Sequence, residues 1–444
     1  MIAAYDLLVG GGDEASLCAA ACAARSGARV GLLRSRREAK RRADASICAV
    51  PNFVWRRLDL QDFGIKLEPV SARVTLMAED QSVATYASPR ATDEALAKNG
   101  SEDHLLWQSF VGDMAQLNQA SSAANGSASP KNGVKTFTAF LADRRQLSAL
   151  GQLSGSCTDL LDDYFSDPKL KTHVAAHALG VAGLGGRELG TASVLPEFLD
   201  ESAWRVRVGE GQSPLRTTLE TICEESGVTM IEGALQLVSI ESGKYKTVEI
   251  SGGETLKARV VFFASPEAAV LAGVETPFLS LPTGRSATAI MRFKLKKSIE
   301  PPAADETAMF QIVDSIKELQ EARDCAVNGQ LPDPLPIEFE FADNGDLIAQ
   351  TKYCPKAFKE ENEWRDWTGQ DRQIVAARIL KRLVSRMPDM TDAVKKSKIT
   401  MLGADDGENS VSAIAPPDLI LVQPDRHNAI GAAVHMVDEV LGYE

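Results

Sequence analysis

The sequence predicts an α/β protein in which a parallel βαβ unit is combined with a second, β-rich domain. The first observation is that residues 6–33 contain an apolar run, an alanine-rich segment and another apolar run. The second is that α/β character returns at 209–266 and again at 418–441. The stretches between these blocks read mainly as strands. We therefore expect one Rossmann-type domain assembled from distant segments, with β-rich insertions between them.

The amino-terminal block is expected to be a βαβ unit. "DLLV" at 6–9 is a short apolar strand, and the alanine-rich segment Glu14–Ser26 reads as a helix that ends at Gly27. "RVGLL" at 29–33 is a second strand. A strand, a helix and a strand within about thirty residues are typical of a parallel pair joined by a crossover helix.

In the middle of the chain the pattern changes from alternating strands and helices to mainly strands and loops. "VTLMAED" and "SVATYAS" predict a hairpin, and residues 117–135 are small, polar and turn-rich, which predicts an exposed, flexible loop. Residues 286–353 add more strands, and 371–387 form an amphipathic helix. The tail gives a buried strand at 418–422, followed by a helix with an apolar stripe formed by Ile430, Val434, Val437 and Leu441.

These patterns predict two discontinuous domains. Residues 1–50, 205–285 and 396–444 are expected to form the Rossmann-type dinucleotide-binding domain. Residues 51–204 and 286–395 are expected to form a β-rich (α+β) substrate or cap-type domain.

Composition excludes several classes of protein. The net charge of −13 argues against nucleic acid as a partner, and no apolar run approaches the length that spans a bilayer. The seven cysteines are scattered and include no C-x-x-C pair, which favours a reducing, cytoplasmic setting over a zinc or disulfide-exchange site. His173 and His177 have the spacing of metal ligands, but no third ligand lies nearby, so no metal site is predicted.

The glycine loop after the first strand is the leading candidate site. Gly10, Gly11 and Gly12 would allow a tight turn and a close approach of the backbone to a pyrophosphate, and Ala15 is small enough for the third glycine position. Asp13 and Glu14 oppose this function, because acidic residues in the first turn of a helix interact favourably with its dipole and would repel a phosphate.

Arg34 ends the second strand, where a dinucleotide-binding fold places an acid that accepts hydrogen bonds from ribose hydroxyls. A guanidinium only donates, so it cannot replace that acid, although it could bind the 2′-phosphate of NADP. Arg34 also opens the basic run 34–42. That run is either a solvated surface or a docking site for an acidic partner or anionic membrane headgroups.

The order of parts resembles the FAD-dependent oxidoreductases of the phytoene-desaturase-like and amine-oxidase-like group. The matching segments are 5–33, a middle block at 209–240, a returning strand at 258–269, and the closing strand and helix at 418–441. The resemblance implies a split FAD/NAD(P)-binding Rossmann domain.

The resemblance also implies further cofactor contacts. It places Gln236 in a strand near the adenine, and Asp425 and Asn428 in the segment that touches the flavin. An active member would bind FAD and remove hydride from a C–C or C–N bond of an apolar small-molecule substrate. No catalytic residue can be assigned.

The chain departs from the family pattern at several flavin contacts together. Residues 37–48 lack the glycine pair that follows the second strand in the family, and Gln423 and Pro424 come directly after the closing strand. These departures favour a degenerate, cofactor-poor subunit or scaffold, a pseudoenzyme working in a protein complex beside an active flavoprotein homologue or other redox partner. An active FAD-dependent desaturase or oxidase is the alternative, and NADP binding through Arg34 is the third.

Overall fold

The computed structural model describes most of the chain. The described residues are 4–12, 14–34, 49–68, 72–125, 151–180, 183–198, 203–207, 215–233, 235–240, 246–251, 253–263, 286–302, 308–341, 345–361, 363–402, 420–421, 434 and 441. They form a mixed α/β fold with one parallel-stranded sheet and a second, β-rich sheet, so the predicted fold class is confirmed.

The first sheet contains the expected βαβ unit. Strands β1 (Ala4–Gly10) and β2 (Val30–Arg34) pair in parallel, and α1 (Glu14–Arg25) connects them. The sheet has the order β8-β2-β1-β11-β10-β9, with β19 paired to β11. The other strands are β8 (Thr229–Glu232), β9 (Leu235–Ile240), β10 (Lys246–Ile250), β11 (Thr255–Phe263) and β19 (Ile420–Leu421). Strands β8, β2, β1, β11 and β19 run parallel, and β9 and β10 form an antiparallel hairpin beside them.

Helix α1 is buried along its length because its side chains are small. Residues 15–23, mostly alanine and cysteine, are all buried, and α11 (Leu215–Glu225) packs on the helix. The Cys223 thiol lies 3.4 Å from the Leu17 carbonyl oxygen, as a weak hydrogen bond between the two helices. The chain leaves α1 through Gly27, whose φ of +94° favours glycine.

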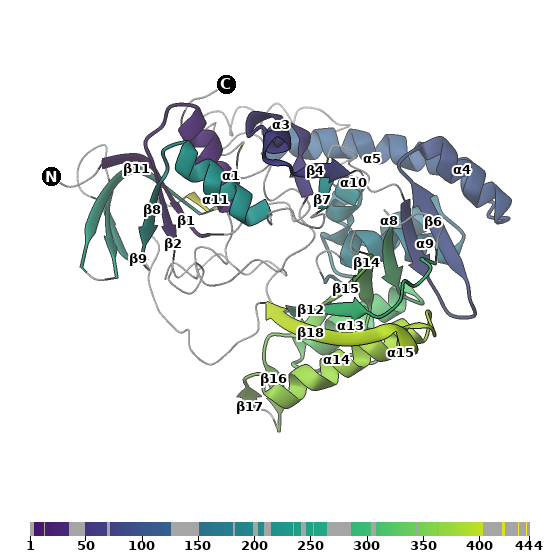
Figure 1. The fold of residues 1–444 in the computed structure, drawn as a ribbon. Coiled ribbons are helices and arrows are strands. Elements are labelled where there is room, and N and C mark those ends of the chain that lie inside the picture. Colours follow the sequence, from purple (N-terminus) through teal and green to yellow (C-terminus); the bar gives the residue numbers. More distant parts are fainter. Residues whose placement is uncertain are drawn as a thin grey trace.

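The second sheet is larger and mostly antiparallel. Its order is β18-β12-β15-β14-β13-β5-β6. Figure 1 shows α14 (Gly369–Val384) lying along the β18 end of this sheet. The strands are β5 (Ala72–Leu76), β6 (Ser82–Tyr86), β12 (Ser286–Leu295), β13 (Met309–Ile312), β14 (Ile337–Phe341), β15 (Leu347–Pro355) and β18 (Val394–Leu402). The hairpin predicted for the segment after residue 72 is present as β5 and β6. The expected domain boundary at 396 falls inside β18, whose pairing with β12 places residues 396–402 in this sheet.

Helices cover the second sheet from different sides. α14 (Gly369–Val384) buries Val375, Ile379 and Leu383 against it. A second cluster of buried side chains contains residues from six other helices together with Tyr353 of β15. These helices are α4 (Pro89–Lys98), α5 (His104–Asn125), α8 (Cys157–Tyr164), α9 (Pro168–Gly180), α10 (Val194–Phe198) and α13 (Ile316–Val327).

Helix α5 extends through residues 117–125, where the sequence predicted an exposed loop. Phe110, Met114 and Leu117 recur at i, i+4 and i+7 and are buried, so one apolar stripe continues into the polar segment. The alanines and glutamine that follow are good helix formers. Residues 126–135 of the predicted loop lie outside the described residues.

A small three-stranded sheet lies beside the first core. Its order is β3-β7-β4, and Val54, Leu58, Leu60 and Ile65 from the same segment pack in the cluster that contains α1. Residues just beyond the expected boundary at 51 therefore contribute to the first core. The elements are β3 (Ala49–Pro51), α3 (Asn52–Arg57), η1 (Leu60–Phe63), β4 (Lys66–Glu68) and β7 (Ala203–Arg207). Shorter elements elsewhere are η2 (Thr191–Ser193), β16 (Phe358–Glu360), β17 (Glu363–Arg365) and α15 (Met390–Ala393).

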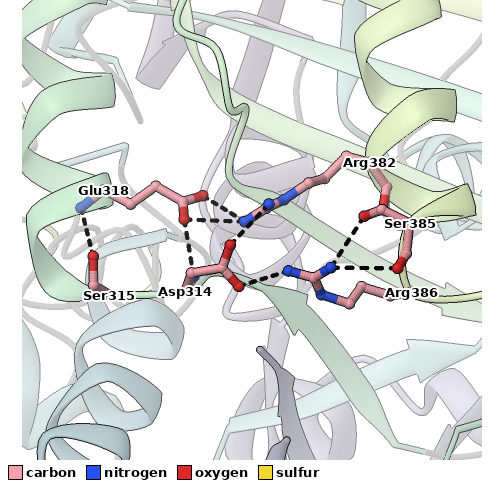
Figure 2. A network of polar contacts seen from close by, with 6 residues as sticks. All are labelled: Asp314, Ser315, Glu318, Arg382, Ser385 and Arg386. Carbon is pink, nitrogen blue, oxygen red and sulfur yellow. Dashed lines mark hydrogen bonds and ion pairs between the residues drawn. The ribbon is translucent and has the colours of Figure 1, made fainter. Parts of the chain in front are cut away.

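An ion network ties α13 to α14 (Figure 2). Arg382 donates to both oxygens of Glu318 at 2.8 and 3.0 Å and to Asp314 at 3.0 Å, and Arg386 donates to Asp314 at 2.7 Å. Burial raises the pKa of Glu318, although the charge of Arg382 opposes this shift. Burial would also raise the pKa of Asp314, but the two arginines outweigh it and the pKa is lowered. The network therefore fixes the start of α13 against the end of α14.

We expect Arg382→Met to destabilise the protein by about 3 kcal/mol, because it leaves the buried carboxylate of Glu318 without its cation. Urea unfolding monitored by circular dichroism measures this change. Lys317→Met is the matched control, since the Lys317–Glu321 pair is exposed and should contribute under about 1 kcal/mol. Equal losses in the two variants would contradict a structural role for the network.

Candidate nucleotide-binding site

The glycine loop has a backbone geometry that suits close approach of a phosphate. Gly11 has a φ of +122°, which side-chain-bearing residues rarely adopt, and its N–H donates to the Leu33 carbonyl at 2.9 Å. The Ser16 hydroxyl lies 3.5 Å from the Gly10 carbonyl oxygen, and Ala15 is buried under the loop. The loop is thus held against the end of β2, with Gly12 leading into the start of α1.

Acidic residues lie at this helix start. Glu14 occupies the first turn of α1. The negative charge of the Glu14 carboxylate offsets the positive end of the α1 dipole, which would otherwise attract a phosphate. Asp13 lies outside the described residues.

Arg34 forms an ion pair that sequence reasoning did not identify. Its Nη1 lies 3.1 Å from Oε1 of Glu220 on α11, and Nε of Arg216 lies 3.6 Å from the same oxygen. The exposed fractions of the side chains are 19% for Arg34, 12% for Arg216 and 30% for Glu220. Two guanidinium groups thus face one carboxylate oxygen.

Neighbouring backbone fixes the position of this pair. The Gly233 N–H, after β8, donates to the Arg34 carbonyl at 3.0 Å, and Arg34 is the register partner of Glu232. Arg34 therefore ends β2 between the glycine loop on one side and β8 on the other. In a Rossmann-type unit this is the place of a nucleotide's ribose.

The remaining predicted cofactor contacts stay predictions. Gln236 belongs to β9, but its side chain lies outside the described part of the structure. Asp425 and Asn428, the altered stretch after the closing strand, and the basic residues 35–42 also lie outside it. Of the predicted stripe on the last helix, Val434 is buried in the first core and Leu441 packs against it.

The histidine pair on α9 is buried under the second sheet. His173 lies 2.8 Å from the Thr75 hydroxyl through Nδ1 and 2.9 Å from the Thr85 hydroxyl through Nε2. Its ring meets that of His177 edge-on, with 4.8 Å between the ring centroids. Within the described residues, no group of three or more histidine, cysteine or acidic side chains could hold a metal ion. Both ring nitrogens of His173 have hydroxyl partners, so we assign it a structural role.

A buried carboxylate lies on the same sheet. Glu338 of β14 is 5% exposed, and its two oxygens accept from the amide groups of Gln311 at 3.1 Å and Gln350 at 2.8 Å. These three residues are register partners on β13, β14 and β15, and Thr75 on β5 continues the row. Because side chains alternate along a strand, this row lies on the face opposite the apolar residues packed on α14.

Comparisons with known proteins establish the fold. No family model matches the sequence, and no curated protein matches it. Putrescine oxidase bound to putrescine superposes with a TM-score of 0.53 at 12% identity, covering 99% of both chains. Cyclohexylamine oxidase from Brevibacterium oxydans gives 0.53 at 13% identity, covering 90% of this chain and 85% of that one. RAB GDI from Plasmodium falciparum gives 0.51 at 8% identity, covering 100% and 99%.

The amine-oxidase part of the predicted resemblance therefore holds at the level of fold, which this chain shares with putrescine oxidase and cyclohexylamine oxidase. At these identities the likeness extends to fold alone.

Among the described residues, no helix combines the length and the apolarity that a bilayer crossing demands.

His173 predicts a pH dependence of stability. Burial, with a smaller contribution from the charge of Arg73, lowers the pKa of His173 from 6.5 to about 3. The unfolded chain therefore binds a proton that the folded chain excludes, and stability falls as the pH drops below 6.5. Between pH 7 and pH 5 we expect wild type to lose about 2 kcal/mol more than His173→Gln, measured by urea unfolding.

The matched control for this experiment is His104→Gln, because His104 is half-buried beside Asp93. The loss of pH dependence should be larger in His173→Gln than in this variant. If wild type and His173→Gln lost stability in parallel, burial of a neutral His173 would not be the cause.

Proposed function

We propose that this chain is a flavin-poor relative of the FAD-dependent oxidoreductases that serves as a noncatalytic subunit or scaffold beside an active redox partner. The observation that carries this proposal is the ion pair between Arg34 and Glu220 at the ribose position. The fold is shared with amine oxidases, but at the nucleotide site Arg34 stands where an acid is expected.

The described residues fit the adenosine half of FAD only in part. The glycine loop suits a pyrophosphate, as the positive φ of Gly11 indicates. At the end of β2, however, a guanidinium replaces the expected carboxylate, and it cannot accept from a ribose hydroxyl. Glu220 supplies a carboxylate nearby, but its Oε1 already faces two arginines. A ribose would have to compete with these charge-assisted contacts.

The start of α1 supports the same interpretation. Glu14 lies in its first turn, so the helix dipole is partly balanced before any ligand arrives. A pyrophosphate placed there would lose attraction to the helix and would meet a like charge. Two independent contacts of the nucleotide are thus weakened, one at the phosphate and one at the ribose.

The structural neighbours are compatible with a noncatalytic role. The same fold occurs in two proteins named as oxidases and in RAB GDI, whose name is not that of an oxidase, with 85% or more of each chain covered. A chain of this fold therefore need not be an oxidase. The basic run at 34–42 and the altered tail remain our proposed surfaces for a protein partner.

An active FAD-dependent desaturase or oxidase is the second candidate. It is supported by the glycine-loop geometry and by the resemblance in fold to putrescine oxidase and cyclohexylamine oxidase. In that case FAD would supply the redox chemistry. The residues of this chain near Gly11 would bind its phosphates and orient it. The two candidates differ in one measurable quantity, the flavin content of the folded chain.

We expect the full-length chain to retain far less than one FAD per chain after purification and after dialysis against excess FAD. Visible absorbance of the protein, and of the supernatant after denaturation, measures this content. The charge-swap variant Arg34→Glu with Glu220→Arg should keep the ion pair and the melting temperature, yet should still bind little FAD, because the tail and the glycine-pair segment also depart from the family pattern.

The control for folding is the single variant Arg34→Glu, which sets two carboxylates against each other and should melt at a lower temperature than the charge swap. Stoichiometric FAD in the wild-type chain would overturn the proposed function and favour the active enzyme.

A further inference from the structure

A group of lysines lies at one corner of the second sheet, where β12 ends and β18 begins. Lys294 of β12 is the register partner of Lys396 of β18. Beyond β12, the Lys296 N–H donates to the Ala393 carbonyl at 2.7 Å, which holds the two segments together. The fold thus gathers basic residues that lie about a hundred positions apart in the sequence. The five lysines of this corner, all exposed, are Lys294, Lys296, Lys297, Lys395 and Lys396.

The charges of this lysine corner are not paired within the described part of the chain. No described residue forms an ion pair or a side-chain hydrogen bond with any of the five lysines. The carboxylate of Asp346 lies beside the corner, but it accepts from the backbone N–H of Leu295 at 3.4 Å. The next register pair along the two strands, Arg292 and Lys398, is cationic as well. In a chain with a net charge of −13, this corner is a concentrated positive surface.

This arrangement goes beyond the protection of a sheet edge. Lysines on an edge strand discourage edge-to-edge aggregation, and Lys395 and Lys396 would serve that purpose alone. Lys294 lies on the inner strand, and like charges directly opposite each other destabilise a sheet. Lys296 and Lys297 add further repulsion beside the start of β18. An anionic ligand that screens these charges would account for the whole group.

The edge of β18 indicates which kind of ligand fits. Among the described strands, only β12 pairs with β18, so alternate N–H and C=O groups of β18 point away from the sheet. An extended peptide can pair with such groups and lengthen the sheet by one strand. A second copy of this chain would set lysines against lysines, because its own β18 carries them.

Two other anionic partners fit this corner less well. A membrane-binding surface usually carries apolar side chains that enter the headgroup layer, but no exposed large apolar side chain of the described residues belongs to β12 or β18. A single-stranded nucleic acid is usually held by exposed aromatic rings on which its bases stack. Phe293, the aromatic residue beside Lys294, is buried. An acidic protein segment needs neither feature.

We propose that the outer edge of β18 binds an acidic, extended segment of a partner protein as an added strand. Side chains alternate along a strand, so carboxylates at every second position of that segment lie beside Lys396 and within reach of Lys294. The main-chain hydrogen bonds supply affinity and the carboxylates supply selectivity. This inference goes beyond the proposed function and does not depend on flavin content, so stoichiometric FAD in the chain would overturn only the proposed function.

Fluorescence anisotropy of a labelled peptide titrated with the full-length chain at low salt tests the proposal. The peptide has nine residues, the length of β18, and alternates glutamate with threonine. We expect it to bind about tenfold more tightly than the same peptide with glutamine in place of glutamate, and to bind more weakly as salt screens the charges. A glutamate–threonine peptide methylated at every peptide nitrogen keeps its charge but cannot donate to β18, so its binding should be lost.

Variants assign the binding to the lysine corner. The double variant Lys294→Gln with Lys396→Gln removes two charges that oppose each other. It should weaken peptide binding about tenfold without lowering the melting temperature. The matched control is Lys98→Gln with Lys169→Gln, which removes two exposed charges from α4 and α9 and should leave binding unchanged.

Four results would each overturn the proposal. Equal binding of the glutamate and glutamine peptides would contradict recognition by charge. Undiminished binding of the methylated peptide would contradict strand addition. Full peptide binding by an aggregating Lys294→Gln, Lys396→Gln variant would leave edge protection as the role of the lysines. Tighter binding of phosphatidylserine vesicles, or of a single-stranded RNA of nine nucleotides, would assign the corner to a membrane or to RNA.

Discussion

The close packing of α1 is the constraint on which the first domain depends. This helix lies between the parallel sheet and α11, and every residue from 15 to 23 is buried. Larger side chains would force the sheet and α11 apart, because protein interiors have little free volume. Alanine and cysteine let both neighbours approach. As a result the glycine loop is held against the end of β2, and α11 comes close enough for Glu220 to reach Arg34.

The second sheet is organised differently, because its two faces have opposite chemistry. One face is aliphatic and aromatic and packs on α14, with Phe310 and Phe339 stacked at 4.9 Å. The other face carries the row that centres on Glu338. Burial of a carboxylate is tolerated there because two amide groups satisfy its oxygens. Polar side chains in this row therefore select one strand register, since any slip would separate Glu338 from its donors.

Local signals in the sequence were sufficient for much of the fold. The βαβ unit could be predicted because its strands, helix and capping glycine follow one another within residues 4–34. The hairpin of β5 and β6 could be predicted for the same reason. The helix at 117–125 was missed, because small polar residues resemble a loop and the burial of Leu117 depends on tertiary contacts. The pairing of β18 with β12 was not predicted either, since it joins strands about a hundred residues apart.

At the candidate site, too, local sequence patterns predict single residues but not the contacts between distant segments. The glycine loop and the unusual Arg34 could be read from one short segment. The role of Glu220 could not, because nothing near it in the sequence marks it as the counter-ion of a residue on β2. The alternation in "IEFEF" places Glu338 and Glu340 on one face of a strand, but the amide partners of Glu338 belong to other strands. A contact between distant segments is created by the fold and leaves no local pattern.

The pair formed by Arg34 and Glu220 joins positions 186 residues apart in the chain. An acid at the end of β2 would place two carboxylates at close range, and loss of Glu220 would remove the carboxylate that Arg34 faces. Each single change is therefore expected to be unfavourable. We therefore expect positions 34 and 220 to change together, because the charge at one position sets the charge that is tolerated at the other.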